Sequence, residues 1–258
     1  MRLISELWQY REMIISLVKR DLKSRYKGSF LGFLWMFLNP LFQLIVYTIV
    51  FSTIMRMGIE NFYLFLFVAL VPWIFFSTCL STGTTVIFSQ QDMVKKIYFP
   101  REVLPLAFTL SQFVNMLLSF VIIFIVVFIS GTKVSGKALL FLPLVMISEF
   151  ILALGVSYLA SSLNVYFRDL EHILSIIAMA WMYLTPVLYP VDMIPEGYMP
   201  VYSLNPMTPI IVAYRDILYY GKSPEGETLL KAFGMGLIVL IIGHLTFAKL
   251  QRKFAEEL

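Results

Sequence analysis

One group of side chains in the sequence has the residue types for acid–base catalysis or metal binding: Arg168, Asp169, Glu171 and His172. These residues lie at the start of a predicted helix, where acidic side chains in the first turn are ordinary partners of the helix dipole. The single cysteine, Cys79, excludes a disulfide or a thiolate metal cluster within one chain. We therefore expect no catalytic residue, no metal site and no bound cofactor in this chain.

A second chemical motif is the segment 131–137, Gly-Thr-Lys-Val-Ser-Gly-Lys, which matches the spacing of a phosphate-binding P-loop. A P-loop needs a Ser or Thr hydroxyl after its lysine to hold magnesium, whereas Ala138 occupies that position here. The segment also joins two predicted helices, not a strand and a helix. If the protein uses ATP and magnesium, we expect both to bind a separate polypeptide.

The composition explains why chemically active side chains are scarce. Hydrophobic residues make up 59% of the 258 residues and charged residues only 14%, with a mean hydropathy of +0.82. A soluble domain carries roughly a quarter charged residues, and a helix needs about 20 apolar residues to cross a bilayer. Six runs are apolar enough, the fifth being the shortest: 31–55, 62–88, 103–130, 139–163, 173–188 and 229–248. The predicted fold is an all-α integral membrane protein with a single transmembrane domain, 1–258.

The positions of lysine and arginine predict the orientation of these helices. Most of them lie before the first run, in the connections after the second and fourth runs, and in the C-terminal tail. Basic segments are retained on the cytoplasmic side, so both termini are predicted to be cytoplasmic. No short apolar core with a small-residue cleavage site is present, and we expect no cleaved signal peptide.

The segment 1–28 has the pattern of an amphipathic helix. Its apolar residues recur at helical spacing: Ile4, Leu7, Trp8, Ile14, Ile15, Val18 and Leu22. The same segment carries several lysines and arginines ahead of the first span. A basic amphipathic helix lies in the membrane interface. A simple positive anchor on the cytoplasmic side explains the charge equally well, so a specific partner contact stays open.

The second cytoplasmic connection, 89–100, predicts a short helix. Ser89 and Asp92 have the spacing of a capping box, and Phe99 before Pro100 is expected to end the helix. A short, capped and partly apolar helix suits the transmission of force from a soluble partner. From the residues alone, an ordinary loop helix resting on the lipid headgroups remains the alternative.

Polar residues inside the spans are few. Hydroxyls follow one side of the second span. Hydroxyls can bond back to the carbonyls of their own helix, so helix packing is one explanation of this stripe. Glu149 is the carboxylate that lies well inside the apolar runs, where it could carry protons, meet a polar substrate or pair with another helix. Because no second carboxylate or base accompanies it, a structural hydrogen bond is favoured.

The external segment 189–227 is rich in proline and holds the apolar stretch 209–220, which is too short to span. Non-helical backbone is tolerated at membrane depth only where protein or a water-filled cavity satisfies it. We therefore expect short re-entrant helices before the last span. A plain external loop with one surface helix is the alternative.

Three segments carry a resemblance to a known family: 20–41 (RDLKSRYKGSFLGFLWMFLNPL), 164–174 (NVYFRDLEHIL) and 204–221 (LNPMTPIIVAYRDILYYG). In this order they resemble the membrane (permease) subunits of type-two ABC exporters, most of all those that export O-antigen for lipopolysaccharide biosynthesis. The resemblance covers nearly the whole chain. Exporters of teichoic acid or capsule share the architecture and stay open as alternatives. An integral-membrane enzyme acting on lipid-linked sugars is a rival from another class.

The resemblance implies a homodimer in the bacterial inner membrane, with two copies of a cytoplasmic ABC ATPase subunit that binds ATP and magnesium. The substrate would be a lipid-linked polysaccharide. It also implies that the segment 90–98 is the coupling helix that docks on the ATPase: Gln90, Gln91, Asp92, Met93, Val94, Lys95, Lys96, Ile97 and Tyr98.

A polysaccharide conduit would use aromatic side chains, because the apolar faces of sugars stack on aromatic rings. Aromatic residues make up 16% of the chain, but many of them belong in the interfacial belts of a membrane protein. The candidates for the lining are Trp35, Phe37, Trp73, Phe76, Ser77, Ser81, Trp181 and Tyr183. The sequence does not decide between a continuous channel and an alternating-access cavity.

Overall fold

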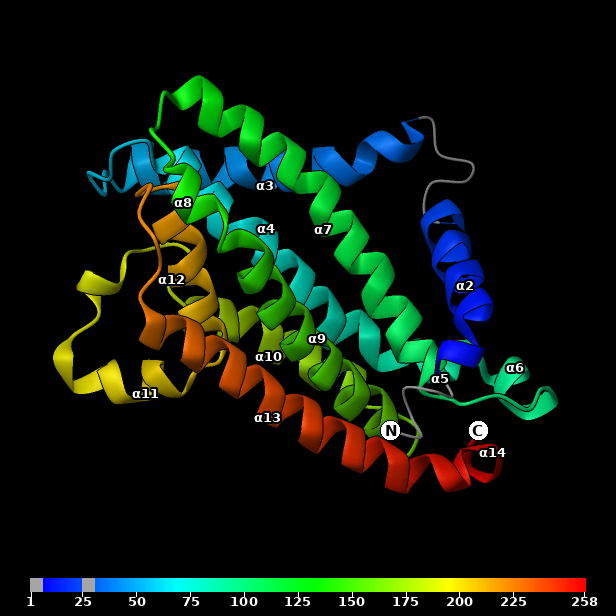
Figure 1. Ribbon diagram of the computed structural model, residues 1–258. Coiled ribbons are helices and arrows are strands. Elements are labelled where there is room, and N and C mark those ends of the chain that lie inside the picture. Colours follow the sequence, from blue (N-terminus) through cyan, green and yellow to red (C-terminus); the bar gives the residue numbers. More distant parts are fainter. Residues whose placement is uncertain (1–6, 25–30) are drawn as a thin grey trace.

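The computed structural model describes residues 7–24 and 31–258, and all regular elements in these residues are helical (Figure 1). Residues 1–6 and 25–28 of the predicted interfacial segment lie outside the described residues. The helices are α2 (Arg11–Ser24), α3 (Trp35–Thr48), α4 (Phe62–Ser81), α5 (Val86–Ser89), α6 (Gln91–Lys96), α7 (Val103–Ser130), α8 (Gly136–Leu139), α9 (Leu142–Asn164), α10 (Leu170–Tyr183), α11 (Met199–Leu204), α12 (Met207–Leu218), α13 (Gly226–Leu250) and α14 (Phe254–Glu257).

Five helical stretches in the described residues are long and apolar enough to cross a membrane: Trp35–Ile54, Phe62–Ser89, Val103–Ser130, Gly136–Asn164 and Gly226–Lys253. They correspond to five of the six expected spans. The chain is therefore a multi-pass helical membrane protein. The first stretch ends in a π-helical turn, Ile49–Ile54, and the second passes through a 3-10 turn, Thr82–Thr85, before α5.

The remaining expected span, 173–188, differs from the structure. The apolar helix there is α10, which has 14 residues and ends at Tyr183. A helix of this length measures about 21 Å, less than the roughly 30 Å of a hydrocarbon core. The helix ends early because Pro186 cannot continue it and disfavours helical geometry at Thr185 before it.

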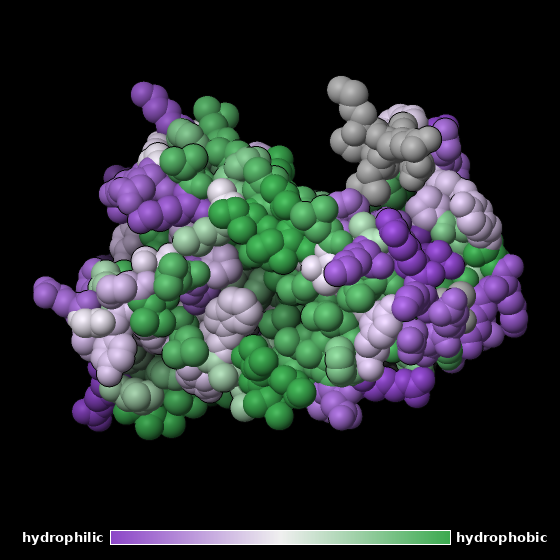
Figure 2. Space-filling view, turned by 90° about the horizontal axis from the view of Figure 1, so that it is seen from below, coloured by the Kyte–Doolittle hydropathy of each residue, from purple (hydrophilic) through white to green (hydrophobic). Residues whose placement is uncertain are grey.

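The long helices run side by side, and the shorter elements gather at the two ends of the bundle (Figure 1). One end holds α2, α5, α6 and α14 with the C-terminus; the other holds α8, α11 and α12. We call these the α6 end and the α12 end. In Figure 2 an apolar surface lies between polar patches at both sides of the view, as expected for a protein that crosses a bilayer.

The core is built around α4, whose residues are buried on nearly all sides, from Phe62 to Leu80. A helix that is hydrophobic all round is typical of the centre of a bundle. It packs against α3, α7, α9, α10 and α12. By contrast, α3, α7 and α13 expose large apolar side chains on their outer faces, including Ile45, Phe128 and Ile241.

Glycines set the distance between α9 and α13. A Cβ atom at Gly155 of α9 would lie 2.5 Å from the backbone nitrogen of Leu240 of α13, and one at Gly243 would collide with the carbonyl oxygen of Gly155. Small residues of this kind let helix backbones approach closely in membranes. The two helices form the most extensive helix pair in the described part of the chain.

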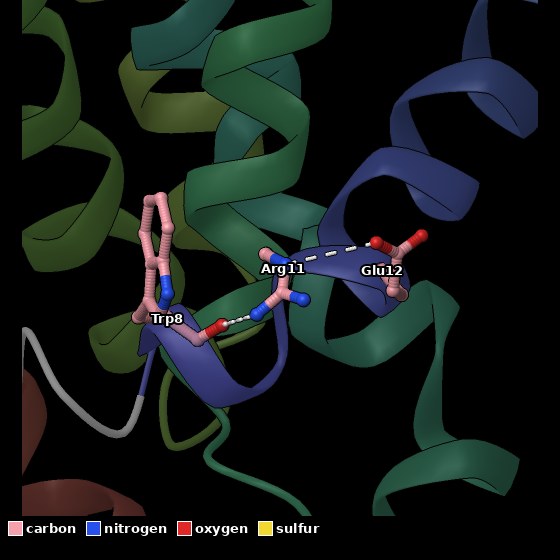
Figure 3. Close-up of polar contacts among 3 residues, drawn as sticks. All are labelled: Trp8, Arg11 and Glu12. Carbon is pink, nitrogen blue, oxygen red and sulfur yellow. Dashed lines mark hydrogen bonds and ion pairs between the residues drawn. The ribbon is translucent and has the colours of Figure 1, made fainter.

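The amphipathic helix α2 packs along α7 at the α6 end. Its side chains Met13, Ile14 and Leu17 pack on an apolar cluster of the main body, whereas Trp8, which precedes the helix, is 68% exposed. At the start of this helix, a guanidinium nitrogen of Arg11 donates to the carbonyl oxygen of Trp8 at 3.5 Å, and its Nε lies 3.7 Å from a Glu12 carboxylate oxygen (Figure 3). The helix therefore contacts the rest of the chain, and an exposed indole lies just before it, which suits an interfacial position.

Candidate functional site: the coupling segment and the external segment

The short cytoplasmic helix expected in the second connection is α6, Gln91–Lys96, and it projects from the α6 end. The capping box expected from Ser89 and Asp92 does not form. The Ser89 hydroxyl donates to the Val86 carbonyl at 3.1 Å because Ser89 is the last residue of α5, so it cannot cap the start of α6. The residue before α6 is Gln90, and no side chain caps the helix there.

The two faces of the segment 90–98 differ in burial. Val94 is 3% exposed and packs with Phe99 in an apolar cluster of the body, and Met93 is partly buried against the same cluster. Ile97 is 57% exposed and Tyr98 is 94% exposed. The exposed apolar surface available to a partner therefore lies at the C-terminal side of α6, in Ile97 and Tyr98.

Charged side chains surround this surface. Lys96 and Asp92 form an exposed ion pair at 3.1 Å, one helical turn apart, and Lys95 is also exposed. Such a pair contributes little to stability, about 0.3–0.5 kcal/mol. Its position beside exposed apolar residues gives the segment the mixed character of a docking surface.

Hydrogen bonds connect the chain near the segment 90–98 to the end of α13. Gln251 Nε2 donates to Glu102 Oε1 at 2.5 Å, and the Tyr166 hydroxyl donates to the Leu250 carbonyl at 2.9 Å. Desolvation raises the pKa of Tyr166, and the carboxylates of Glu257 and Glu256 raise it further, so the phenol stays protonated and can donate. These two hydrogen bonds therefore join the end of α13 to the start of α7 and to the 164–170 connection, close to α6.

The residues considered for catalysis lie on the surface of this region. Arg168, Asp169, Glu171 and His172 are exposed, and the Arg168 guanidinium lies 4.8 Å from the centre of the Phe88 ring. Glu171 occupies the first turn of α10, the position that the helix dipole favours for an acid. Within the described residues, His, Cys, Asp and Glu form no group of three that could hold a metal ion.

The segment that matches the P-loop spacing lies between α7 and α8, away from α6 (Figure 1). Helices flank it on both sides, and Gly131 ends α7 with a positive φ of 70°. A phosphate-binding loop follows a strand, so this context does not support a nucleotide site.

The candidates for the conduit lining divide into two groups. Trp73 and Phe76 are buried in the core, where the Phe76 ring meets the Trp181 ring edge to face at 5.3 Å. Trp35 is 38% exposed and Tyr183 is 54% exposed, so these two rings reach the surface of the chain. The structure therefore gathers Trp73, Phe76 and Trp181 into one cluster, leaves Trp35 and Tyr183 at the surface and half-buries Phe37 on α3. Their role in a conduit stays a prediction.

The hydroxyls of the second span bond to their own helix. Ser81 donates to the Ser77 carbonyl at 2.7 Å, Thr78 donates to the Ile74 carbonyl at 2.7 Å, and Thr84 donates to the Leu80 carbonyl at 2.6 Å. This is the pattern by which hydroxyls are satisfied in an apolar helix. The stripe therefore needs no ligand to explain it.

The external segment contains short helices, and α12 is the one that enters the core. Nearly all its residues are buried, and it packs against α4, α9 and α13. Asn205 fixes its start, because its side-chain oxygen accepts from the Met207 backbone N–H and from Trp181 Nε1, both at 3.0 Å. Its amide nitrogen donates to the Thr185 hydroxyl at 2.8 Å, which ties α12 to the end of α10.

Arg215 of α12 is 3% exposed and donates only to backbone carbonyls in the described part of the chain. Its guanidinium nitrogens lie 2.5 Å from the Pro186 oxygen, 2.6 Å from the Val187 oxygen, 3.1 Å from the Tyr189 oxygen and 3.4 Å from the Phe65 oxygen. The planar guanidinium thus supplies hydrogen-bond donors for the backbone carbonyls of the irregular segment that follows α10. Inside a membrane, irregular backbone needs partners of this kind within the protein.

Glu149 of α9 also meets α12. The Tyr214 hydroxyl donates to Glu149 Oε2 at 2.6 Å, and both side chains are fully buried. The structural hydrogen bond expected for this carboxylate is therefore present. Sequence reasoning missed its partner, and it missed Asn205 and Arg215. An arginine and aspartate inside the apolar stretch 209–220 were the available signal, because charges in such a stretch require internal partners.

Five membrane-length helices, a short helix projecting at one end and a segment folded back into the bundle at the other define a multi-pass helical membrane protein. Comparison with known families agrees: residues 12–219 match the family described as ABC-2 type transporter, and the chain belongs to this family. It is the membrane subunit, and in such transporters the ATPase activity belongs to a partner chain.

Relatives match over most of the chain. The chain is 38% identical to an O-antigen export system permease protein RfbA from Myxococcus xanthus, covering 100% of this chain and 99% of the relative. It is 34% identical to an RfbA from Klebsiella pneumoniae, covering 95% and 94%. It is also 22% identical to the polysialic acid transport protein KpsM from Escherichia coli, covering 88% and 89%.

Proposed function

We propose that this chain is the permease of an ABC exporter that moves lipid-linked O-antigen, or a similar polysaccharide, across the bacterial inner membrane. The 38% identity to an RfbA permease over the whole chain carries this proposal. The aligned region covers the whole chain, so it contains the coupling segment, the spans and the external segment. The chain contributes a path and a lever, and ATP is hydrolysed on the partner subunit.

The proposed topology has six crossings with both termini in the cytoplasm. Five crossings are the membrane-length helices, and α10 with the residues that follow it forms the sixth. The grouping of α2, α6 and α14 at one end supports this arrangement, because the basic segments then share one side of the membrane. The segment 189–227 lies at the opposite side, where α12 re-enters the bundle.

The working assembly would be a homodimer with two ATPase subunits. Large apolar side chains exposed on α3, such as Phe42, Ile45 and Val46, provide surface for lipid or for a second copy. Two copies of the chain would enclose the polysaccharide path between them. In the ATPase contact, Ile97 and Tyr98 of the segment 90–98 would insert into the partner, and closure of the ATPases would move this segment.

A deletion of the gene tests the proposed function in cells. Loss of surface O-antigen, with accumulation of the lipid-linked polysaccharide inside the cell, is expected, and expression of the chain from a plasmid should restore export. Normal surface polysaccharide in the deletion strain would contradict the proposal.

A capsule polysaccharide is the second candidate substrate. The similarity to KpsM over 88% of the chain favours it, but at 22% identity the support is weaker than that from the RfbA permeases. Loss of capsule with intact O-antigen in the same deletion strain would identify the second candidate.

A further inference from the structure

A cavity of ≈410 Å³ lies between α3, α4 and α7. Its volume is within the range of ligand pockets, about 300–1,000 Å³. No charged side chain is among its lining residues. Its polar groups are the side chains of Asn39, Thr78, Gln112, Asn115 and Ser119, and Trp35 and Phe75 supply aromatic rings.

Two of the carboxamides have polar atoms with no hydrogen-bond partner in the described part of the chain. Gln112 is 5% exposed, and its Nε2 makes no hydrogen bond; the Oδ1 atom of Asn115 is likewise buried and unpaired. The one contact between them runs from Asn115 Nδ2 to Gln112 Oε1 at 3.5 Å. The pair therefore leaves one donor and one acceptor in the lining of the cavity.

The hydroxyls of the same lining differ from the carboxamides. Thr78 donates to the Ile74 carbonyl at 2.7 Å, and Ser119 donates to the Asn115 carbonyl at 3.0 Å, so the helices themselves satisfy both hydroxyls as donors. Buried polar atoms without partners are unfavourable, above all at membrane depth. A turn of each carboxamide about its last side-chain bond can bring the unpaired atoms of Gln112 and Asn115 toward the cavity, where a hydrogen-bonding group would satisfy them.

We infer that this cavity is a saccharide subsite, which binds a neutral sugar unit of the exported polysaccharide. A sugar hydroxyl can donate to the Asn115 oxygen and accept from the Gln112 nitrogen at the same time, whereas a phosphate has no donor in its ionised form and is bound by arginine or lysine. The rings of Trp35 and Phe75 can cover the apolar face of a sugar. This inference rests on the proposed function and assigns the substrate a location within the chain.

The subsite adjoins a second cavity that leads toward the coupling segment. That cavity, of ≈400 Å³, lies between α2, α5 and α7, and its lining includes Arg20 and Gln90. Thr78 lines both cavities. Only the second cavity therefore separates a sugar bound beside Gln112 from Gln90, the first residue of the segment 90–98. Binding of a sugar in the subsite can thereby influence the position of that segment.

Intrinsic fluorescence of Trp35 tests the inference without altering the carboxamides. The probe is the glycan released by mild acid from the lipid-linked polysaccharide of the same cells, titrated into the purified exporter. We expect a saturable change in tryptophan emission that is absent in Trp35→Phe. No change with the glycan, or a change only when phospholipid is added, would overturn the inference.

A double variant, Gln112→Met with Asn115→Leu, tests the polar pair in transport. Both changes keep a side chain of similar length while they remove the unpaired atoms. We expect about tenfold weaker glycan binding and a matching loss in stimulation of ATP hydrolysis, as the loss of about 1.4 kcal/mol of binding free energy implies. Gln43→Leu is the matched control, because Gln43 is an exposed amide on α3 outside the cavity.

The outcomes separate this inference from the proposed function. If the wild-type exporter moves no polysaccharide, the proposed function fails. If it moves polysaccharide while Trp35 is unresponsive and the double variant binds and transports as the wild type does, only the subsite is contradicted. If the double variant does not fold, the Trp35 titration of the wild-type protein still decides the question.

Discussion

The guanidinium carbon of Arg215 lies 3.6 Å from the centre of the Phe65 ring, so a charged side chain of the external segment stacks on the central helix α4. The same side chain donates to the carbonyls that follow α10. One residue therefore joins α12, the central helix α4 and the irregular connection that follows α10. In a membrane protein, that arrangement supplies the partners that an irregular backbone needs at depth.

Arg215→Met should lower the free energy of unfolding by about 3 kcal/mol, because each carbonyl left without a donor costs about 1 kcal/mol or more. Arg215→Lys should recover only part of this, since an ammonium cannot reproduce the planar fork. Thermal unfolding in detergent measures both variants. Lys231→Met is the control: Lys231 pairs with Glu227 at 2.6 Å and both side chains are exposed, at 49% and 72%, so its loss should cost little stability. Equal effects of Arg215→Met and Lys231→Met would remove the joining role.

Tyr214→Phe should destabilise the protein by about 1–3 kcal/mol, because it leaves the fully buried carboxyl of Glu149 without its donor. Glu149→Gln should cost less, since the amide oxygen still accepts from Tyr214. The same unfolding experiment compares the two. If Glu149→Gln were fully stable and abolished export, the carboxyl would have a role in transport beyond this hydrogen bond.

Gly155→Ala and Gly243→Ala should each push α9 and α13 apart and lower stability by about 1–3 kcal/mol, the range for overpacking. Gly234→Ala on α13 is a matched control, because a Cβ there meets nothing within 4 Å. The control should be neutral or slightly stabilising. Unfolding midpoints of the three variants that did not differ would contradict the close approach of the helices.

Ile97→Asp and Tyr98→Ala should uncouple ATP hydrolysis from export while leaving the fold intact, because both side chains are exposed at the C-terminal side of α6. Val94→Asp should instead unfold the region, since Val94 is buried in the apolar cluster beneath it. Copurification with the ATPase, export and unfolding midpoints distinguish the two effects. Wild-type export by both Ile97→Asp and Tyr98→Ala would remove this segment as the lever.

The sequence predicted the long spans well because continuous apolar runs with polar ends leave little choice of boundary. The run 103–130 coincides with α7, Val103–Ser130. The predicted span 173–188 differs more from the structure, in which α10 ends at Tyr183. Hydrophobicity alone does not reveal that Pro186 interrupts the helix. The same limit applies to Ser89, whose spacing to Asp92 suits a cap but whose own position at the end of α5 prevents one.

The polar contacts of the candidate site were the least predictable part. The sequence argument assigned Arg215 no role, and its partners are backbone carbonyls that carry no sequence signature. Glu149 stood out as an intramembrane carboxylate, but Tyr214, its donor, is 65 residues away. The cavity beside Gln112 depends on how α3, α4 and α7 meet, which periodicity does not specify.

Reconstitution of the purified chain with its ATPase subunit in proteoliposomes tests the central claim most directly. We predict that lipid-linked polysaccharide stimulates ATP hydrolysis and crosses the bilayer only when both subunits and ATP are present. The absence of a stable complex with the ATPase subunit, or a complex whose ATP hydrolysis and bilayer permeability are unchanged by the lipid-linked polysaccharide, would contradict the claim.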